Sequence, residues 1–143
     1  MKTVGDVIKK KGNKVWSVIP STTVYDTLKL MADREIGAVL VLEEGHPVGI
    51  FSERDYARQV ILKGRTSKDT PVREVMSSRI VFVRPAQSIE DCMALMTDKR
   101  VRHLPVMHQG ALTGMLSIGD VVKEMISEKQ FLIEQLANYI QQG

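Results

Sequence analysis

The chain contains the same unit twice. Residues 20–61 align without a gap on residues 85–126 when they are moved forward by the 65 positions that separate Pro20 from Pro85. A unit of about 60 residues buries too little apolar surface to be stable alone, so we expect the two copies to pack on each other. The positions kept in both copies are the first place to look for function. They include Asp26/Asp91, Met31/Met96, Gly45/Gly110, Gly49/Gly114, Ser52/Ser117 and Asp55/Asp120.

Each copy predicts a strand, a helix, two strands and a second helix, in a mixed α+β fold. In copy one the strands are expected at 15–19, 38–42 and 48–52, because these runs are apolar and the last two flank a Gly-containing turn. Thr23 and Asp26 form the pattern that begins a helix, and Ser88 and Asp91 repeat it. Residues 53–62 predict the second helix, with Tyr56, Val60 and Ile61 on its buried side.

Short leaders, residues 4–8 and 72–76, precede the two copies at an offset of 68 (from Val4 to Val72). We therefore expect a first unit with its leader at 1–66, a second unit at 67–127 and a terminal helix at 128–143, capped by Ser127. The apolar stripe of that helix would dock on its own chain, on a partner helix or on a second subunit. It consists of Phe131, Leu132, Leu136, Tyr139 and Ile140.

Composition narrows the class of protein. A formal net charge of +3 with interspersed signs, and only seven aromatic residues (three Phe, three Tyr, one Trp), argue against a nucleic-acid-binding protein. The single cysteine, Cys92, excludes an internal disulfide, and its apolar surroundings predict a core residue. No signal peptide is visible, and no apolar run approaches the ~18 residues of a membrane span. The expectation is a cytoplasmic protein without membrane contact.

A Gly–apolar–apolar–Ser–x–x–Asp pattern lies near the end of each copy, at 49–55 and at 114–120. A serine three residues before an aspartate at a helix start commonly forms only a helix cap. Here a strand and a glycine precede the serine, so a ligand could approach the backbone closely, and the helix N-terminus suits an anion. The aspartate could then accept hydrogen bonds from a ribose diol, while the serine donates to a phosphate. From the motif alone, both interpretations stay open.

Arg102, His103, Leu104, Pro105 and Val106 precede the second motif on its middle strand. Taken with the order of elements, the leaders and the prolines after the first strands, these motifs resemble a tandem CBS-domain protein, a free-standing Bateman module, over residues 1–127. The resemblance implies two β-α-β-β-α units packed sheet to sheet about a pseudo-twofold axis, with two clefts between them. It also implies a non-catalytic regulatory module, dimeric with a second copy, that binds AMP, ADP, ATP, the adenylate part of NAD(H) or S-adenosylmethionine and signals to an unidentified partner protein.

The resemblance favours Asp120 and Asp55 as ribose ligands and Ser117 and Ser52 as phosphate ligands. In copy two an arginine fork and an imidazole, Arg102 and His103, would grip phosphate, where copy one has Gly37 and Ala38. Copy one offers Arg54 instead, so we expect the copy-two site to bind more tightly. The adenine ring is expected against the leading strands. Val15, Ile80 and the neighbouring Lys14 complete the candidate nucleotide-binding residues.

Other functions fit less well. The sequence shows no recognisable pairing of a nucleophile with a base, so we expect no catalysis. His46, His103 and His108 lack metal-ligand spacing, and no G-x-G-x-x-G follows a strand, so neither a metal site nor a Rossmann site is predicted. The alternative that remains is a structural or interaction protein with the same fold and no physiological ligand.

Overall fold

The structure is a computed structural model that describes residues 2–12 and 14–142. These residues form two compact units: unit 1 contains the described residues of 1–13 and 81–143, and unit 2 contains 14–80. The units differ from the expected sequence boundaries of 1–66 and 67–127. Each leader lies with the other copy. Val4, Val7 and Ile8 pack in the core of copy two, and Ser77, next to the second leader, exchanges backbone hydrogen bonds with Ile50 of copy one.

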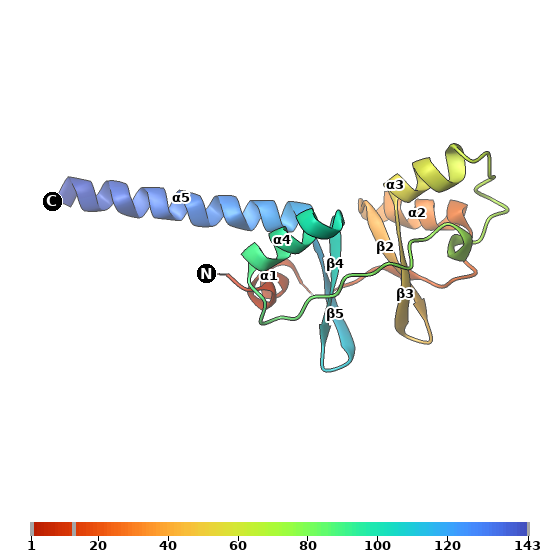
Figure 1. The fold of residues 1–143 in the computed structure, drawn as a ribbon, viewed down its shortest axis with the longest axis horizontal. Helices are drawn as coiled ribbons and strands as arrows, with labels where there is room; N and C mark the ends of the chain where they lie inside the picture. The colour runs from red at the N-terminus through yellow and green to blue at the C-terminus, as the bar shows by residue number, and fades with distance from the viewer. Residues whose placement is uncertain (1, 13, 143) are drawn as a thin grey trace. The chain divides into compact units, whose positions relative to one another are not determined.

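Unit 2 is built on a three-stranded sheet of order β1-β2-β3, of which Figure 1 labels β2 and β3. Strand β1 is parallel to β2, and β2 is antiparallel to β3. The core lies between this sheet and the helices, around Phe51, Val39 and Val24. The elements are β1 (Ser17–Val18), α2 (Val24–Arg34), β2 (Ala38–Glu43), β3 (His46–Ser52), α3 (Glu53–Asp55), a π-helix (Tyr56–Ile61) and a 3-10 turn (Val72–Glu74).

Unit 1 repeats this plan with an antiparallel pair, β4-β5. Its core gathers around Leu104, Leu116 and Ile89, with Val4, Val7 and Ile8 from the leader helix. The elements are α1 (Val4–Lys11), α4 (Ile89–Lys99), β4 (His103–His108), β5 (Ala111–Ser117) and α5 (Ile118–Gln142). The expected first strand of copy two is reduced to one parallel bridge, Val83 to Val106, because only Val83 exchanges backbone hydrogen bonds with β4.

The backbone confirms the duplication. Glu35 and Arg100 end α2 and α4 in the left-handed conformation, with φ of 54° and 56°. Two-residue turns with positive φ close both hairpins, at Glu44–Gly45 and Gln109–Gly110. The same bulge follows Val41 in one hairpin and Val106 in the other. The strands thus extend further into the expected turns than the apolar runs predict, to Glu43 and from His46.

The glycine that opens each motif is explained by the exchanged leaders. A Cβ on Gly114 would lie 2.8 Å from Ile8 Cδ1, and a Cβ on Gly49 would lie 2.2 Å from Met76 Sδ. Ile8 and Met76 are equivalent leader positions, so each leader packs a side chain onto the bare backbone of a motif glycine. The expectation that these glycines admit a ligand is therefore wrong, because their open face is filled by the protein itself.

Two local expectations are corrected in the helices. Residues 53–62 form one α-helical turn followed by a π-helix, in which Leu62 N–H donates to the Ala57 carbonyl oxygen. Val60 is buried as expected, but Ile61 is 56% exposed because no described segment covers the last turn. The terminal helix does not begin at Ser127. Helix α5 runs for 25 residues from Ile118, so Ser127 lies in its interior and caps nothing.

Cys92 is buried in the core of unit 1, as expected. Burial, with Asp91 and Glu90 nearby, raises the pKa of its thiol to about 11. Because the thiolate is the reactive form, we expect no reaction of the folded protein with a thiol reagent at pH 8 and full reaction in denaturant. Absorbance from the reagent reports the extent, and stoichiometric labelling of folded protein within minutes would contradict the assignment.

Candidate functional site

The start of α5 brings together the two motif residues of copy two. Ser117 N–H donates to Asp120 Oδ2 at 2.8 Å, and Asp120 N–H donates to Ser117 Oγ at 3.1 Å. This reciprocal pair is a capping box, which satisfies backbone groups that a helix start leaves unpaired. The cap interpretation of the motif is therefore confirmed. A ligand role would be added to the cap rather than replace it.

Lys11, which no motif in the sequence indicates, completes this cluster. Its Nζ lies 2.6 Å from Asp120 Oδ2 and donates to the Met115 carbonyl oxygen at 2.8 Å. Helix α1 delivers it, since Lys11 is the last residue of that helix. A sequence signal was present: at the leader offset of 68, Lys11 aligns with Arg79, so a cation follows each leader by three residues.

His103 lies beside the same cluster. It is the first residue of β4 and pairs with Ser117 across the hairpin, while Arg102 accepts a hydrogen bond from Ile118 N–H through its carbonyl oxygen at 2.8 Å. Burial lowers the pKa of His103 below its usual value, and the positive charges of Lys11 and Arg102 lower it further, against the effect of Asp120. At neutral pH the imidazole is neutral and available as a hydrogen-bond partner.

The surroundings of Asp120 stabilise the ionised form of its carboxyl group. Burial alone would raise its pKa, but the hydrogen bonds from Lys11 and Ser117 outweigh burial and hold the pKa below 3.8. A carboxyl whose pKa falls on folding stabilises the protein above its unfolded pKa, and this contribution is lost as the pH drops through the folded pKa. Asp120 is therefore an anion at any physiological pH, as an acceptor for hydroxyl groups must be.

Lys11→Met is expected to change the cluster without removing its carboxylate. The half-exposed ion pair contributes at most about 1 kcal/mol, so the variant should stay folded. Its Asp120 should titrate at higher pH, because the Lys11 bond is the main influence that lowers the pKa. Carboxyl titration by NMR, with Lys10→Met as the control from the same helix, measures this. An unchanged Asp120 pKa would show that the ion pair does not form in solution.

Unit 2 holds the counterpart of the motif, without the added cation. Ser52 N–H donates to Asp55 Oδ2 at 2.9 Å and Asp55 N–H donates to Ser52 Oγ at 3.2 Å, which gives the same capping box at the start of α3. Arg54 lies between them and is exposed. Within the described residues, Arg79 makes no ion pair with Asp55. The two motifs therefore share a backbone geometry and differ in charge.

The remaining candidate residues lie in unit 2. Val15 and Ile80 are half-buried. Lys14 is exposed, and its ammonium lies 4.6 Å from the centre of the Trp16 ring, with the Arg34 guanidinium 4.0 Å from the same ring. Lys14 is thus engaged in a cation–π contact. Among the described residues, no hydrogen bond or ion pair joins Val15, Lys14 or Ile80 to the Ser52–Asp55 pair, so their role in binding stays a prediction.

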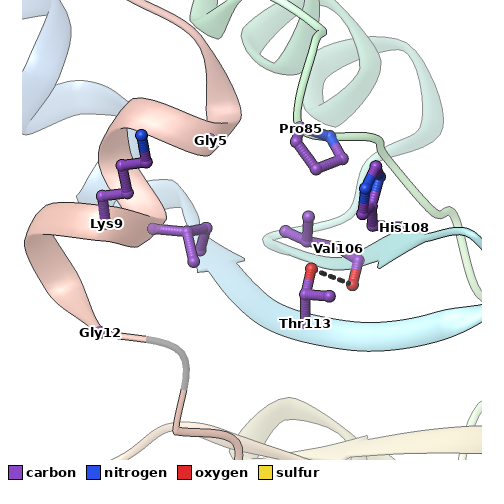
Figure 2. Close-up of a pocket in the computed structure, with 8 residues that line it drawn as sticks. Gly5, Lys9, Gly12, Pro85, Val106, His108 and Thr113 are labelled. Carbon is purple, nitrogen blue, oxygen red and sulfur yellow. Dashed lines mark hydrogen bonds between the residues drawn. The ribbon is translucent and has the colours of Figure 1, made fainter.

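A separate hollow of about 440 Å³ lies at the turn end of the β4-β5 hairpin (Figure 2). Lys9 flanks it on α1, while Pro85 and His108 lie across from it. Thr113 Oγ1 donates to the Val106 carbonyl oxygen at 3.3 Å at its edge. Because His103 and Ser117 pair at the opposite end of the hairpin, this hollow is distinct from the Asp120 cluster.

The described residues include no group of three or more His, Cys, Asp and Glu side chains placed to hold a metal ion. Within residues 2–12 and 14–142, no helix combines the length and the apolar character that a membrane crossing requires. His46 and His108 are both exposed.

Comparison with known proteins defines the class. The family model described as "CBS domain" matches residues 4–61 and 72–127, once for each copy. The chain therefore belongs to the CBS-domain family and carries a tandem pair. The matches end at residue 127, so the second half of α5 lies outside them.

Relatives share this organisation. CBS domain-containing protein CBSX3, mitochondrial, from Arabidopsis thaliana is 38% identical over 151 residues, which cover 99% of this chain and 73% of that protein. The solved structure of a signal-transduction protein with CBS domains from Burkholderia ambifaria is 46% identical, with a TM-score of 0.85, over 88% of this chain and 95% of that one. A hexameric CBS-CP12 protein from bloom-forming cyanobacteria is 28% identical, with a TM-score of 0.75, over 84% of this chain and 70% of that one.

Proposed function

We propose that this protein is a non-catalytic sensor that binds an adenine nucleotide, AMP, ATP or the adenylate part of NAD(H), at its Ser–x–x–Asp motifs and signals the occupancy to a partner protein. The observation that carries the proposal is the cluster at the start of α5. There an ionised, half-buried Asp120 lies beside Lys11 and His103 at a helix N-terminus. A diol needs an anionic acceptor and a phosphate needs cationic and N–H donors, and this cluster holds both within one unit.

In this proposal each residue has one task. Asp120 accepts hydrogen bonds from the ribose hydroxyls, and Lys11 turns from the carboxylate towards the phosphate. Ser117 and the first N–H groups of α5 donate to phosphate oxygens, with Arg102 as an additional cation. Asp55, Ser52 and Arg54 do the same in unit 2 with less charge, which makes that site the weaker one. Adenine would contact Val15 or Ile80, next to Lys14.

Nucleotide-dependent thermal shift tests the proposal. AMP, ADP, ATP, NAD, NADH and S-adenosylmethionine are each added to the purified protein, and a ligand at 100 times its Kd should stabilise the fold by about 2.7 kcal/mol. Mass spectrometry of the denatured protein should also detect an adenosine compound that co-purified with it. If no nucleotide shifts the melting temperature and none co-purifies, the chain is better described as a structural or interaction protein of the CBS fold.

The exposed half of α5 favours a role in assembly alongside binding. Phe131, Leu132, Leu136, Tyr139 and Ile140 are 53–76% exposed, so the described chain leaves most of the expected stripe uncovered on the part of α5 that extends past α1 and α4 (Figure 1). Docking on its own chain, one of the three expected outcomes, is not observed. We propose a homodimer in which a second copy covers this face, with the regulated partner as the alternative.

The proposed location of the protein is the cytoplasm, and cell fractionation tests this.

Removal of residues 128–143 should therefore change assembly and leave nucleotide binding intact. The truncation removes the exposed apolar face but no residue of the Asp120 cluster. Sedimentation velocity at tens of micromolar protein is expected to show a dimer for the full chain and a smaller species after truncation. A full-length chain that sediments as a 16 kDa monomer with and without nucleotide would exclude the homodimer.

A further inference from the structure

A second cavity, of about 810 Å³, lies among α1, α4 and α5 of unit 1. Its charged lining contains four carboxylates, Asp6, Glu90, Glu124 and Glu128, and two ammonium groups, Lys2 and Lys10. Four negative and two positive charges leave a local balance of −2, in a chain whose net charge is +3. The cavity is therefore an acidic site in a basic protein. It shares no residue with the Asp120 cluster.

Two of these carboxylates have no partner in the described chain. Asp6 accepts from Thr3 N–H at 3.0 Å, and Glu128 accepts from Lys2 N–H at 2.7 Å. Glu124, by contrast, is only 7% exposed, lines the cavity and takes part in no hydrogen bond or ion pair among the described residues. Oε2 of Glu90 is fully buried and also unpaired. A buried polar atom without a donor lowers the stability of a fold, so Oε2 of Glu90 points to a ligand that supplies the donor, and Glu124 presents its unpaired carboxylate to the same cavity.

The arrangement of the carboxylates in the cavity indicates which kind of cation would bind there. A bare metal ion needs several ligands at one point, and the described residues offer no such group. Ammonium groups joined by a carbon chain can instead meet separate carboxylates one by one. The chain between them would lie against Phe131, an exposed aromatic side chain at the edge of the cavity. We propose that this cavity binds an aliphatic polyamine, with Glu124 and Glu90 as the carboxylates that receive its ammonium groups.

Titration calorimetry of the full-length protein with spermidine and with putrescine tests the proposal. Saturable binding at a stoichiometry of one is expected, with spermidine tighter because it carries one more ammonium group. Glu124→Gln should weaken spermidine binding at least tenfold, since it removes the charge and keeps the shape. Glu90→Gln should weaken it in the same direction. Glu134→Gln, an exposed residue of the same helix outside the cavity, is the matched control and should bind as the wild type does.

The unliganded proteins supply a second readout. Glu124→Gln should melt at the same temperature as the wild type, because Glu124 forms no hydrogen bond or ion pair among the described residues, while its stabilisation by spermidine is lost. The proposal is overturned if spermidine does not bind, if Glu124→Gln binds it as tightly as the wild type, or if Glu134→Gln weakens binding equally. An equal stabilisation by magnesium chloride at matched ionic strength would also overturn it. If Glu124→Gln does not fold, Glu90→Gln decides the question.

Discussion

Asp120→Ala is expected to weaken adenine-nucleotide binding by about ten- to a hundredfold. The change removes the acceptor for a ribose diol, and charge-assisted hydrogen bonds of this kind contribute roughly 1.5 to 3 kcal/mol together. It also frees Lys11, which then has no carboxylate to hold it at the start of α5. Calorimetry with AMP and with NAD measures the loss. Asp55→Ala should have a smaller effect, because that motif lacks the paired lysine.

A control must separate loss of a ligand from loss of a helix cap. Asp6 makes the same capping box at the start of α1, where Thr3 N–H donates to Asp6 Oδ2 at 3.0 Å and Asp6 N–H donates to Thr3 Oγ1 at 3.2 Å. Asp6→Ala should therefore cost about as much helix stability, near 1 kcal/mol, without changing nucleotide affinity. Both variants should keep the circular dichroism spectrum of the wild type. If Asp120→Ala binds AMP and NAD as tightly as the wild type does, Asp120 is a cap and nothing more.

Gly114→Ala is expected to destabilise the fold by roughly 1 to 3 kcal/mol, the usual cost of an overpacked core. The new methyl group would lie 2.8 Å from Ile8 Cδ1 and 3.2 Å from Ile8 Cγ2. Ile8 is branched and held in the core, so it cannot move aside freely. Gly49→Ala should lower the free energy of unfolding by less than Gly114→Ala does, although its contact is closer, because the Met76 side chain is unbranched and can turn away. Urea unfolding followed by circular dichroism gives both values.

A double-mutant cycle tests whether the leader causes this cost. Ile8→Ala removes the three atoms nearest to the methyl group of Gly114→Ala, so the cost should fall by about 0.5 kcal/mol or more in this background, as coupling between touching residues predicts. Gly119→Ala is the control, since its Cβ would have only an ordinary contact, 3.6 Å from Ser117 Oγ. Equal costs of Gly114→Ala in both backgrounds would mean that Ile8 does not pack on β5 in solution.

Local chemistry made much of the fold predictable from sequence. The caps at Thr23 and Ser88 and the turn glycines act on residues close in the chain, so their patterns suffice to locate helices and hairpins. The exchange of leaders could not be predicted in this way. It depends on the packing of Ile8 and Met76 against glycines far away in sequence, and an apolar leader fits either copy by pattern alone.

The candidate site shows the same division. Ser117 and Asp120 are adjacent through their motif, whereas Lys11 reaches Asp120 from 109 positions away. Assigning Lys11 to its own copy in sequence hid this contact. The prediction of a helix start at Ser127 was wrong because it relied on a local signal alone. A serine with an apolar pattern after it is a weak signal, and an unbroken run of helix-forming residues on both sides overrides it.

The continuity of α5 has a mechanical consequence. Its 25 residues form one rod of about 37 Å, with Asp120 in its first turn and the exposed apolar face in its second half. A rod has no joint at which a movement could be absorbed. If a nucleotide at the first turn tilts the helix by about 10°, the far end sweeps roughly 6 Å, which is about one helical turn. Such a lever would convert a small adjustment around one carboxylate into a displacement large enough to separate or engage two apolar surfaces.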